Sequence, residues 1–289
     1  MKVLITGAGG QVGRSLAANA PGGTKLIATT RGELDIVNEA ATAAAINHEQ
    51  PDLIINAAAY TAVDKAESEP KLARQVNEIG ARNLAEAAAQ SGARLIHIST
   101  DFVFDGKSSV PYLPSDTPAP LGTYGKTKLA GERAVLGCLP DRSIVLRTAW
   151  VYAPLGRNFV LTMLRLMREK GSVRVVSDQI GSPTSGASIA DAIWAFSARA
   201  DVHGTFHWTD AGVTSWYDFA VAISEEAAAC GLLPERAEVI PISTEDYPTP
   251  ARRPAFSVLD CQATIDEIGI EPPHWRDSLK RVLEEIKRG

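Results

Sequence analysis

The chain has 289 residues, of which 45% are hydrophobic and 22% charged, and it carries a net charge of −5 at pH 7. This length and apolar content can bury a full core, in one large α/β domain or in one domain with a smaller lobe. A mildly acidic chain without a basic stripe excludes a surface built to hold a nucleic-acid backbone.

The cysteines and the apolar runs bear on where the protein works. Cys138, Cys230 and Cys261 are odd in number and far apart, which is typical of reduced thiols. Neither an apolar signal core after Met1 nor an apolar run of about 18 residues occurs, so we expect a cytoplasmic protein without a membrane partner. The five histidines lack metal-ligand spacing, and we predict no catalytic metal.

The first segment predicts a strand over residues 2–6, a glycine turn and a helix. Gly7, Gly10 and Gly13 have the spacing of a dinucleotide-binding turn: the first for the tight turn, the second for close approach to a pyrophosphate, the third for helix packing. Helix N-terminal amides would face the anion. The alternative is a flexible turn with incidental glycines.

The end of the second predicted strand, residues 25–29, is where such a fold contacts the adenine ribose. Thr30 and Arg31 there can accept a 2′-phosphate, which favours NADPH over NADH, and Asp35 can lie beside the adenine. A solvated arginine is the alternative. Three alanines after the strand at 53–56 leave room either for a flat ligand or for tight helix packing.

A long helix is predicted over residues 70–90, and a strand over 94–100 follows it. Because open α/β sheets bind ligands at strand carboxyl ends, Thr100 is a candidate to hydrogen-bond the reacting oxygen of a substrate. Trp150 follows the strand at 143–147 in the same way. Its ring can stack on a sugar or belong to the core.

Tyr124 and Lys128 lie four residues apart on a predicted helix, so their side chains share one face. A phenol with a pKa near 10 is a poor acid or base at pH 7, and a neighbouring ammonium that favours the phenolate lowers its pKa. The pair therefore suits proton transfer to or from a sugar or alcohol oxygen.

The pattern changes after residue 152, with longer loops between the elements. Residues 1–150 read as a Rossmann-type doubly wound domain, to which later segments are free to return, and 151–289 mainly as a smaller mixed α/β substrate lobe. The helices expected in that lobe cover 158–170, 188–199, 215–229 and 274–287, and the strands lie near 173–176, 204–208 and 238–242.

Six ordered blocks resemble the extended short-chain dehydrogenase/reductase family and, within it, the dTDP-4-dehydrorhamnose reductases. They begin at Gly10, Asn56, Ser99, Arg147, Asp178 and Ala251, and the resemblance also includes the pair Tyr124 and Lys128. It implies that NADPH or NADH gives hydride to C4 of dTDP-4-dehydro-β-L-rhamnose while Tyr124 donates the proton. Lys128 would hold the nicotinamide ribose, and Thr100 would bond the same oxygen.

The resemblance also assigns the other contacts. The pyrophosphate would lie on Gly7, Gly10, Gln11 and Val12, the adenine near Asp35 and Ile36, and the rest of the cofactor along Ala58, Ala59 and Tyr60. The sugar would touch Thr100, Asp101 and Trp150, and the nucleotide diphosphate would lie near Asn158 and Arg253.

Two departures from the family pattern matter. Phe102 replaces a common tyrosine, which removes a hydroxyl and keeps an aromatic surface. Some members of the family form dimers around a magnesium ion that is held by glutamates. In this chain the residues near the corresponding positions are Ser15 and Ser188, and hydroxyls are poor substitutes for carboxylates on a hard cation. Magnesium is therefore doubtful, and a monomer or a homodimer is expected.

Rival functions remain. A 4,6-dehydratase would need a glutamate at Phe102. Another nucleotide-4-keto-sugar reductase or an epimerase stays possible, as does a non-catalytic NADP-binding regulatory subunit like the β subunit of methionine adenosyltransferase, because fold does not fix function.

Overall fold

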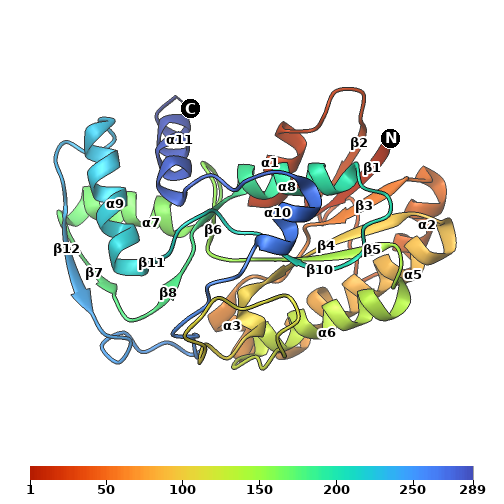
Figure 1. The fold of residues 1–289 in the computed structure, drawn as a ribbon, viewed down its shortest axis with the longest axis horizontal. Helices are drawn as coiled ribbons and strands as arrows, with labels where there is room; N and C mark the ends of the chain where they lie inside the picture. Colours follow the sequence, from red (N-terminus) through yellow and green to blue (C-terminus); the bar gives the residue numbers. More distant parts are fainter. Residues whose placement is uncertain (289) are drawn as a thin grey trace.

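Six parallel strands form the main sheet of this computed structural model, which describes residues 1–288. Their order is β10-β5-β4-β3-β1-β2 (Figure 1). The chain leaves β1 toward β2 and then crosses to β3, so the strand order reverses there, which is where such sheets bind ligands. The strands are β1 (Lys2–Thr6), β2 (Lys25–Thr29), β3 (Leu53–Asn56), β4 (Arg94–Thr100), β5 (Ser143–Thr148) and β10 (Gly204–His207).

Helices cover both faces of this sheet. One layer contains α1 (Gln11–Ala18) and α8 (Gly186–Ser197), and the other contains α2 (Glu39–Glu49), α5 (Ala81–Ser91) and α6 (Thr123–Cys138). Successive residues of β1 and β3 pack alternately into the two layers, as a strand buried on both sides requires. The doubly wound Rossmann-type fold is confirmed.

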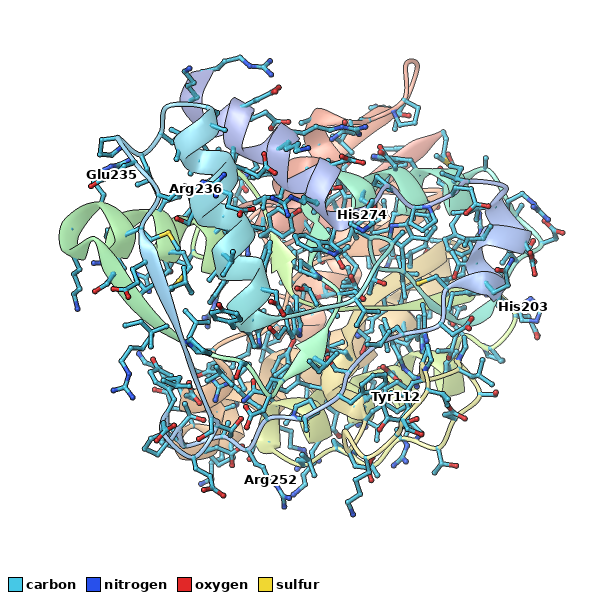
Figure 2. All side chains as sticks on the ribbon, turned by 60° about the vertical axis from the view of Figure 1, so that its left-hand side comes forward. Tyr112, His203, Glu235, Arg236, Arg252 and His274 are labelled. Carbon is cyan, nitrogen blue, oxygen red and sulfur yellow. The ribbon has the colours of Figure 1, made fainter. Side chains whose placement is uncertain are left out.

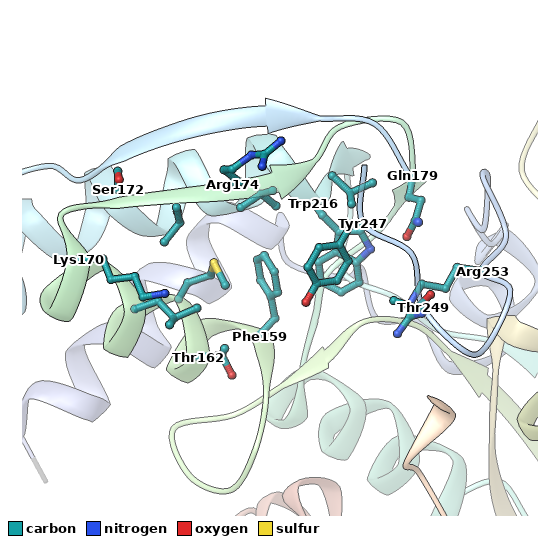
Figure 3. Close-up of a pocket in the computed structure, with 15 residues that line it drawn as sticks. Phe159, Thr162, Lys170, Ser172, Arg174, Gln179, Trp216, Tyr247, Thr249 and Arg253 are labelled. Atoms are coloured by element: carbon teal, nitrogen blue, oxygen red, sulfur yellow. The ribbon is translucent and has the colours of Figure 1, made fainter. Parts of the chain in front are cut away.

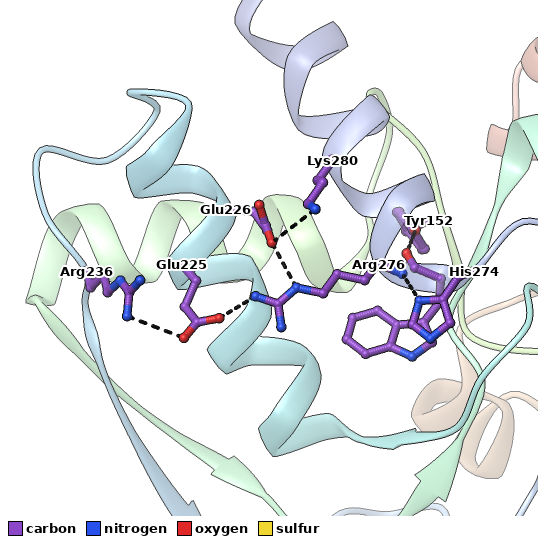
Figure 4. A network of polar contacts seen from close by, with 8 residues as sticks. Tyr152, Glu225, Glu226, Arg236, His274, Arg276 and Lys280 are labelled. Atoms are coloured by element: carbon purple, nitrogen blue, oxygen red, sulfur yellow. Dashed lines mark hydrogen bonds and ion pairs between the residues drawn. The ribbon is translucent and has the colours of Figure 1, made fainter.

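A second lobe has its own core and lies at the left of Figure 1. β7 (Ser172–Val176) and β12 (Glu238–Ile242) pair in parallel, and three helices pack with them: α7 (Phe159–Lys170), α9 (Trp216–Ala229) and α11 (Trp275–Arg288). Arg276 of α11 reaches the carboxylates of Glu225 and Glu226 on α9 (Figure 4). This network joins the two helices across the surface of the lobe.

Later parts of the chain also contact the first sheet. β10 pairs with β5, α8 packs on α1, and α10 (Gln262–Ile268) lies against β10 and α8. The domain boundary at residue 150 stays a prediction. Two short strand pairs lie beyond it: β6 (Val151–Tyr152) with β9 (Thr184–Ser185), and β8 (Ile180–Gly181) with β11 (Thr214–Ser215).

The prediction of one continuous helix over residues 70–90 is wrong in its middle part. It is divided into α4 (Pro70–Arg74), a π-helical segment (Gln75–Gly80) and α5. Asn77 lies in the π-helical segment, where its side chain accepts from the Tyr60 amide at 2.8 Å and donates to the Tyr60 carbonyl and the Thr127 hydroxyl. A π-bulge of this kind is common beside functional sites. Three short helical segments also lacked a sequence signal: α3 (Val63–Ser68), a 3-10 turn (Asp101–Val103) and α10.

Within the described residues, the helices are too short or too polar for any of them to cross a membrane.

Candidate active site

The glycine turn after β1 admits no side chain at two positions. Gly7 has φ of 73°, and a Cβ there would lie 2.5 Å from the Ala58 nitrogen. A Cβ on Gly13 would lie 2.4 Å from the Gly7 carbonyl oxygen. The turn therefore packs directly on the segment after β3. Gly10 is the N-cap of α1 and offers no side-chain cap, which leaves the first-turn amides for an anion.

A cavity of about 300 Å³ opens beside this turn. Its wall contains most of the expected cofactor residues, which come from the segments that follow β1, β2 and β3. The three alanines at 57–59 also line it, so their small side chains leave room for a flat ligand. A dinucleotide fits this set of residues, and the first-turn amides of α1 beside the cavity are free to bind its phosphates. The expected cofactor residues in its wall are Gly7, Gly10, Thr30, Arg31, Asp35, Ile36, Ala58, Ala59 and Tyr60.

The loop after β2 holds a carboxylate that the sequence reading overlooked. Glu33 accepts from both the amide and the hydroxyl of Thr30, each at 2.8 Å. The Arg31 guanidinium lies 3.5 Å from the Asp35 carboxylate. This end of the cavity thus offers both an acidic and a basic group to an adenine ribose, so it suits NADPH and NADH alike.

Tyr124, Thr100 and Asp101 meet at the carboxyl end of β4. The Thr100 hydroxyl donates to Asp101 Oδ1 at 2.9 Å, and the Phe102 ring lies edge-on to the Tyr124 ring with centroids 5.6 Å apart. Asp101 is buried, and its Oδ2 has no hydrogen-bond partner among residues 1–288. Burial raises the pKa of Asp101 to about 6, against the hydrogen bonds of Ser257 and Thr100, which lower it.

The prediction that Lys128 lowers the pKa of Tyr124 is wrong in this structure. Burial raises the pKa of Tyr124 to about 12, with the Thr100 hydroxyl acting to lower it and Asp101 to raise it further. Lys128 is 2% exposed and donates to the Ile98 carbonyl at 2.7 Å. Burial lowers the Lys128 pKa to about 8. The phenol is therefore held in its protonated form at neutral pH.

Helix α6 is seated closely by glycines and by a buried ion pair. A Cβ at Gly125 would lie 2.2 Å from the Phe102 carbonyl oxygen, and one at Gly131 would lie 2.1 Å from that of Asn77. Glu132 accepts from Arg147 of β5 at 2.8 Å, and Ser99 of β4 donates to the same carboxylate. These contacts position the helix that carries Tyr124 and Lys128.

Trp150 has a strained backbone, with φ of 49°. Few non-glycine residues adopt a positive φ, and those that do are found preferentially at functional sites. Its ring stacks on that of Trp216 with centroids 3.5 Å apart, and a Cβ at Gly181 would collide with it at 2.5 Å. Trp150 is half-buried at the junction of the two lobes. Its stacking on Trp216 was predicted neither by the interpretation as a sugar contact nor by the interpretation as a core residue.

A large cavity, with a volume of about 700 Å³, lies in the second lobe (Figure 3). Aromatic rings from α7, α9 and the loop before Arg253 line it together with basic side chains. Arg253 and Thr249 lie at one end and Lys170 at the other. Most residues of this wall were not predicted from the sequence, because they are far apart in the chain. They include Phe159, Trp216, Tyr247, Lys170 and Arg174.

Two expected diphosphate contacts have other partners. Asn158 caps α7 by accepting from the Leu161 amide, and its own amide donates to Gln11 Oε1 and the Ala153 carbonyl, each at 2.8 Å. Both amide hydrogens of Asn158 are thus used within the chain, and its contact with a diphosphate stays a prediction. Arg253 lines the large cavity and pairs with Asp64 at 2.9 Å.

Ser15 and Ser188, near the positions where some family members have magnesium-binding glutamates, both form hydrogen bonds within the chain. Ser15 donates to the Gln11 carbonyl at 3.1 Å, and Ser188 is buried and accepts from the Trp208 indole at 2.9 Å. Over residues 1–288 the structure contains no cluster of three or more His, Cys, Asp or Glu side chains suited to a metal ion.

A family model described as the RmlD substrate binding domain matches residues 1–288. The chain belongs to the RmlD substrate binding domain family. Its relatives in this family include a dTDP-4-dehydrorhamnose reductase from Aggregatibacter actinomycetemcomitans, which is 44% identical, the match covering 97% of this chain and 98% of the relative.

Solved structures agree with membership of the RmlD family. A dTDP-4-dehydrorhamnose reductase from Clostridium acetobutylicum is 40% identical with a TM-score of 0.93, and the match covers 99% of this chain and all of that one. One from Bacillus anthracis, in complex with NADP, is 37% identical with a TM-score of 0.92, over 98% and 99% of the two chains. The resemblance inferred from the sequence blocks is confirmed.

Proposed function

We propose that this chain uses NADPH or NADH to reduce the C4 ketone of dTDP-4-dehydro-β-L-rhamnose to dTDP-β-L-rhamnose. This is the last step of dTDP-rhamnose synthesis, which serves cell-wall polysaccharide. The observation that carries the proposal is the meeting of Tyr124, Thr100 and Asp101 at a strand end in a chain that matches named reductases over its full length.

The cofactor supplies a hydride for C4 when it is bound. Tyr124, kept as a neutral phenol by burial, donates its proton to the C4 oxygen. Thr100 turns its hydroxyl hydrogen from Asp101 to the same oxygen, and Lys128 holds the nicotinamide ribose. Gly7, Gly10, Gln11 and Val12 hold the pyrophosphate, in line with the free first turn of α1.

The large cavity is the proposed site of the nucleotide part of the substrate. Its aromatic rings suit a base, and Arg253 at its edge suits a diphosphate, because a guanidinium makes forked hydrogen bonds to phosphate oxygens. Trp150, whose ring is fixed by Trp216 and Gly181, is a proposed contact of the sugar. Asp101 is a further proposed contact of the sugar.

Tyr124→Phe tests the proton donor. We expect kcat to fall by about 10²–10⁴, because general acid catalysis is lost, while the dissociation constant of NADPH stays within about twofold. The measurement is loss of nicotinamide absorbance with dTDP-4-dehydrorhamnose, and Tyr217→Phe in the second lobe is the matched control. Wild-type turnover by Tyr124→Phe would place the donor elsewhere.

The same assay separates the rival functions. A panel of nucleotide 4-keto-sugars with NADPH and NADH identifies the preferred substrate and cofactor. Turnover without added reductant would indicate an epimerase, and binding of NADPH without any turnover would indicate a regulatory subunit.

A further inference from the structure

A row of buried polar side chains crosses the main sheet beneath the proposed nicotinamide site. Thr6, Asn56 and His97 occupy paired positions on β1, β3 and β4, on the face that α6 covers. Thr6 donates to Asn56 Oδ1 at 2.9 Å, and the Asn56 amide lies 3.0 Å from His97 Nδ1. The row ends at Lys128, whose Nζ is 3.4 Å from His97 Nε2.

The hydrogen bonds of Asn56 determine which nitrogen of His97 carries the proton. The Ala58 amide, which can only donate, lies 3.1 Å from Asn56 Oδ1, so the oxygen of this side chain faces Ala58 and its NH₂ group faces His97. His97 Nδ1 must then accept. A neutral imidazole that accepts at Nδ1 carries its hydrogen at Nε2, the atom beside Lys128.

This tautomer discriminates between the two forms of Lys128. An ammonium has three donors and no lone pair, so it meets the Nε2–H as donor against donor. A neutral amine accepts the hydrogen from Nε2 instead. Burial favours the same form and lowers the Lys128 pKa to about 8, and burial together with Lys128 keeps the pKa of His97 well below its usual value.

The other charged and polar groups around Lys128 oppose this effect or are already paired. The Ile98 carbonyl accepts from Lys128, and Glu132 one turn along raises its pKa, although Arg147 and Ser99 share that carboxylate. Other charged and phenolic groups lie on α6 and on the elements packed against it. Several are already paired: Asp64 with Arg253, Glu67 with Thr123, and Glu78 with Arg74 and Arg82. The others include Tyr124, Asp101, Lys65, Lys71, Glu86, Arg94, Lys126 and Arg133.

We propose that His97 is a positioning residue whose Nε2–H, aimed by Asn56, stabilises the neutral amine of Lys128 relative to its ammonium. This inference rests on the proposed reductase function, in which Lys128 holds the nicotinamide ribose.

The test follows the protonation of Lys128 directly, in protein labelled with ¹³C at lysine Cε, with Lys128→Met to assign its signal. His97→Leu removes the opposing N–H, and His97→Gln keeps the pattern because its oxygen can accept from Asn56 while its NH₂ group donates to Lys128. We expect the titration midpoint of Lys128 to rise by about one pH unit in His97→Leu, a tenfold tighter hold on the proton, and to stay within about 0.3 units in His97→Gln.

A second measurement needs no variant. The ¹⁵N shifts of the wild-type ring at neutral pH should identify a hydrogen at Nε2. A hydrogen at Nδ1, or a Lys128 midpoint that stays or falls in His97→Leu, overturns the proposal. Both measurements use the protein without cofactor or substrate, so they give a result even if the chain proves not to be a reductase. In an active enzyme, the alkaline limit of kcat should move upward in His97→Leu alone.

Discussion

We expect two buried aspartates to make the stability of this protein depend on pH. Burial raises the pKa of Asp101 and of Asp210 to about 6, and each has one carboxylate oxygen without a hydrogen-bond partner in the described chain. Between about pH 4 and pH 6 the folded state therefore binds more protons than the unfolded state. The free energy of unfolding consequently falls as the pH rises through this window.

Asp210→Asn should reduce this pH dependence. A shift of roughly two pKa units corresponds to about 3 kcal/mol at most, so the variant should gain stability relative to wild type at pH 8 and gain little at pH 4. Thermal unfolding at pH 4, 5, 6 and 8 measures this, with exposed Asp141→Asn as the control. Equal loss of stability by wild type and Asp210→Asn between pH 4 and pH 8 would contradict the prediction.

Helix α6 is the element on which the proposed chemistry depends most. It carries Tyr124 and Lys128, and its two close contacts, at Gly125 and Gly131, are with backbone carbonyls rather than with flexible side chains. A carbonyl belonging to a helix or a tight turn cannot move aside without moving its element. A methyl group at Gly131 would therefore push α6 away from the π-helical segment, and the segment away from Tyr60, which Asn77 holds.

Gly131→Ala and Gly137→Ala form a matched pair on this helix. At Gly131 we expect a loss of about 1–3 kcal/mol of stability and a lower kcat, because a Cβ would lie 2.1 Å from the Asn77 oxygen. At Gly137 a Cβ meets no atom within 4 Å, and alanine should stabilise the helix by up to about 1 kcal/mol. Denaturant unfolding and steady-state kinetics measure both. A change of the same sign at the two sites would count against the argument.

At the scale of the whole molecule, the loop that carries Arg253 ties the second lobe to the first. Arg253 pairs with Asp64 of α3, 189 positions earlier, and also lines the large cavity. Gln11 and Asn158 make a second link, between α1 and the start of α7. A substrate whose nucleotide lies in the large cavity and whose sugar reaches Tyr124 spans both lobes. Arg253 is therefore placed to act on both binding and lobe arrangement.

Arg253→Met should weaken the binding of dTDP by about tenfold or more, because hydrogen bonds to a charged group contribute about 1.5–3 kcal/mol. Binding of NADPH should change little. Titration calorimetry with each ligand measures this, and Arg252→Met is the control, since the neighbouring side chain is exposed and extends from the surface in Figure 2. If Arg252→Met weakens dTDP binding as much as Arg253→Met, the effect is one of net charge.

Local and periodic features of the sequence determined the main sheet and much of the proposed chemistry. The apolar runs at 2–6, 53–56 and 143–148 form strands that are buried on both faces. Short continuous apolar runs are typical of such strands in parallel sheets. The spacing of Gly7 and Gly13 anticipated a turn without side chains because a tight turn and a close helix contact act over few residues. Tyr124 and Lys128 share a face of α6 for the same local reason.

Only the tertiary structure decided what depends on contacts between distant segments. The π-helical segment within the predicted long helix, the stacking of Trp150 on Trp216 and the wall of the large cavity each join residues that are far apart in the chain. The pKa values of Tyr124, Lys128 and Asp101 were decided in the same way. Burial, which exists only once the layers pack, is the largest cause of all three shifts.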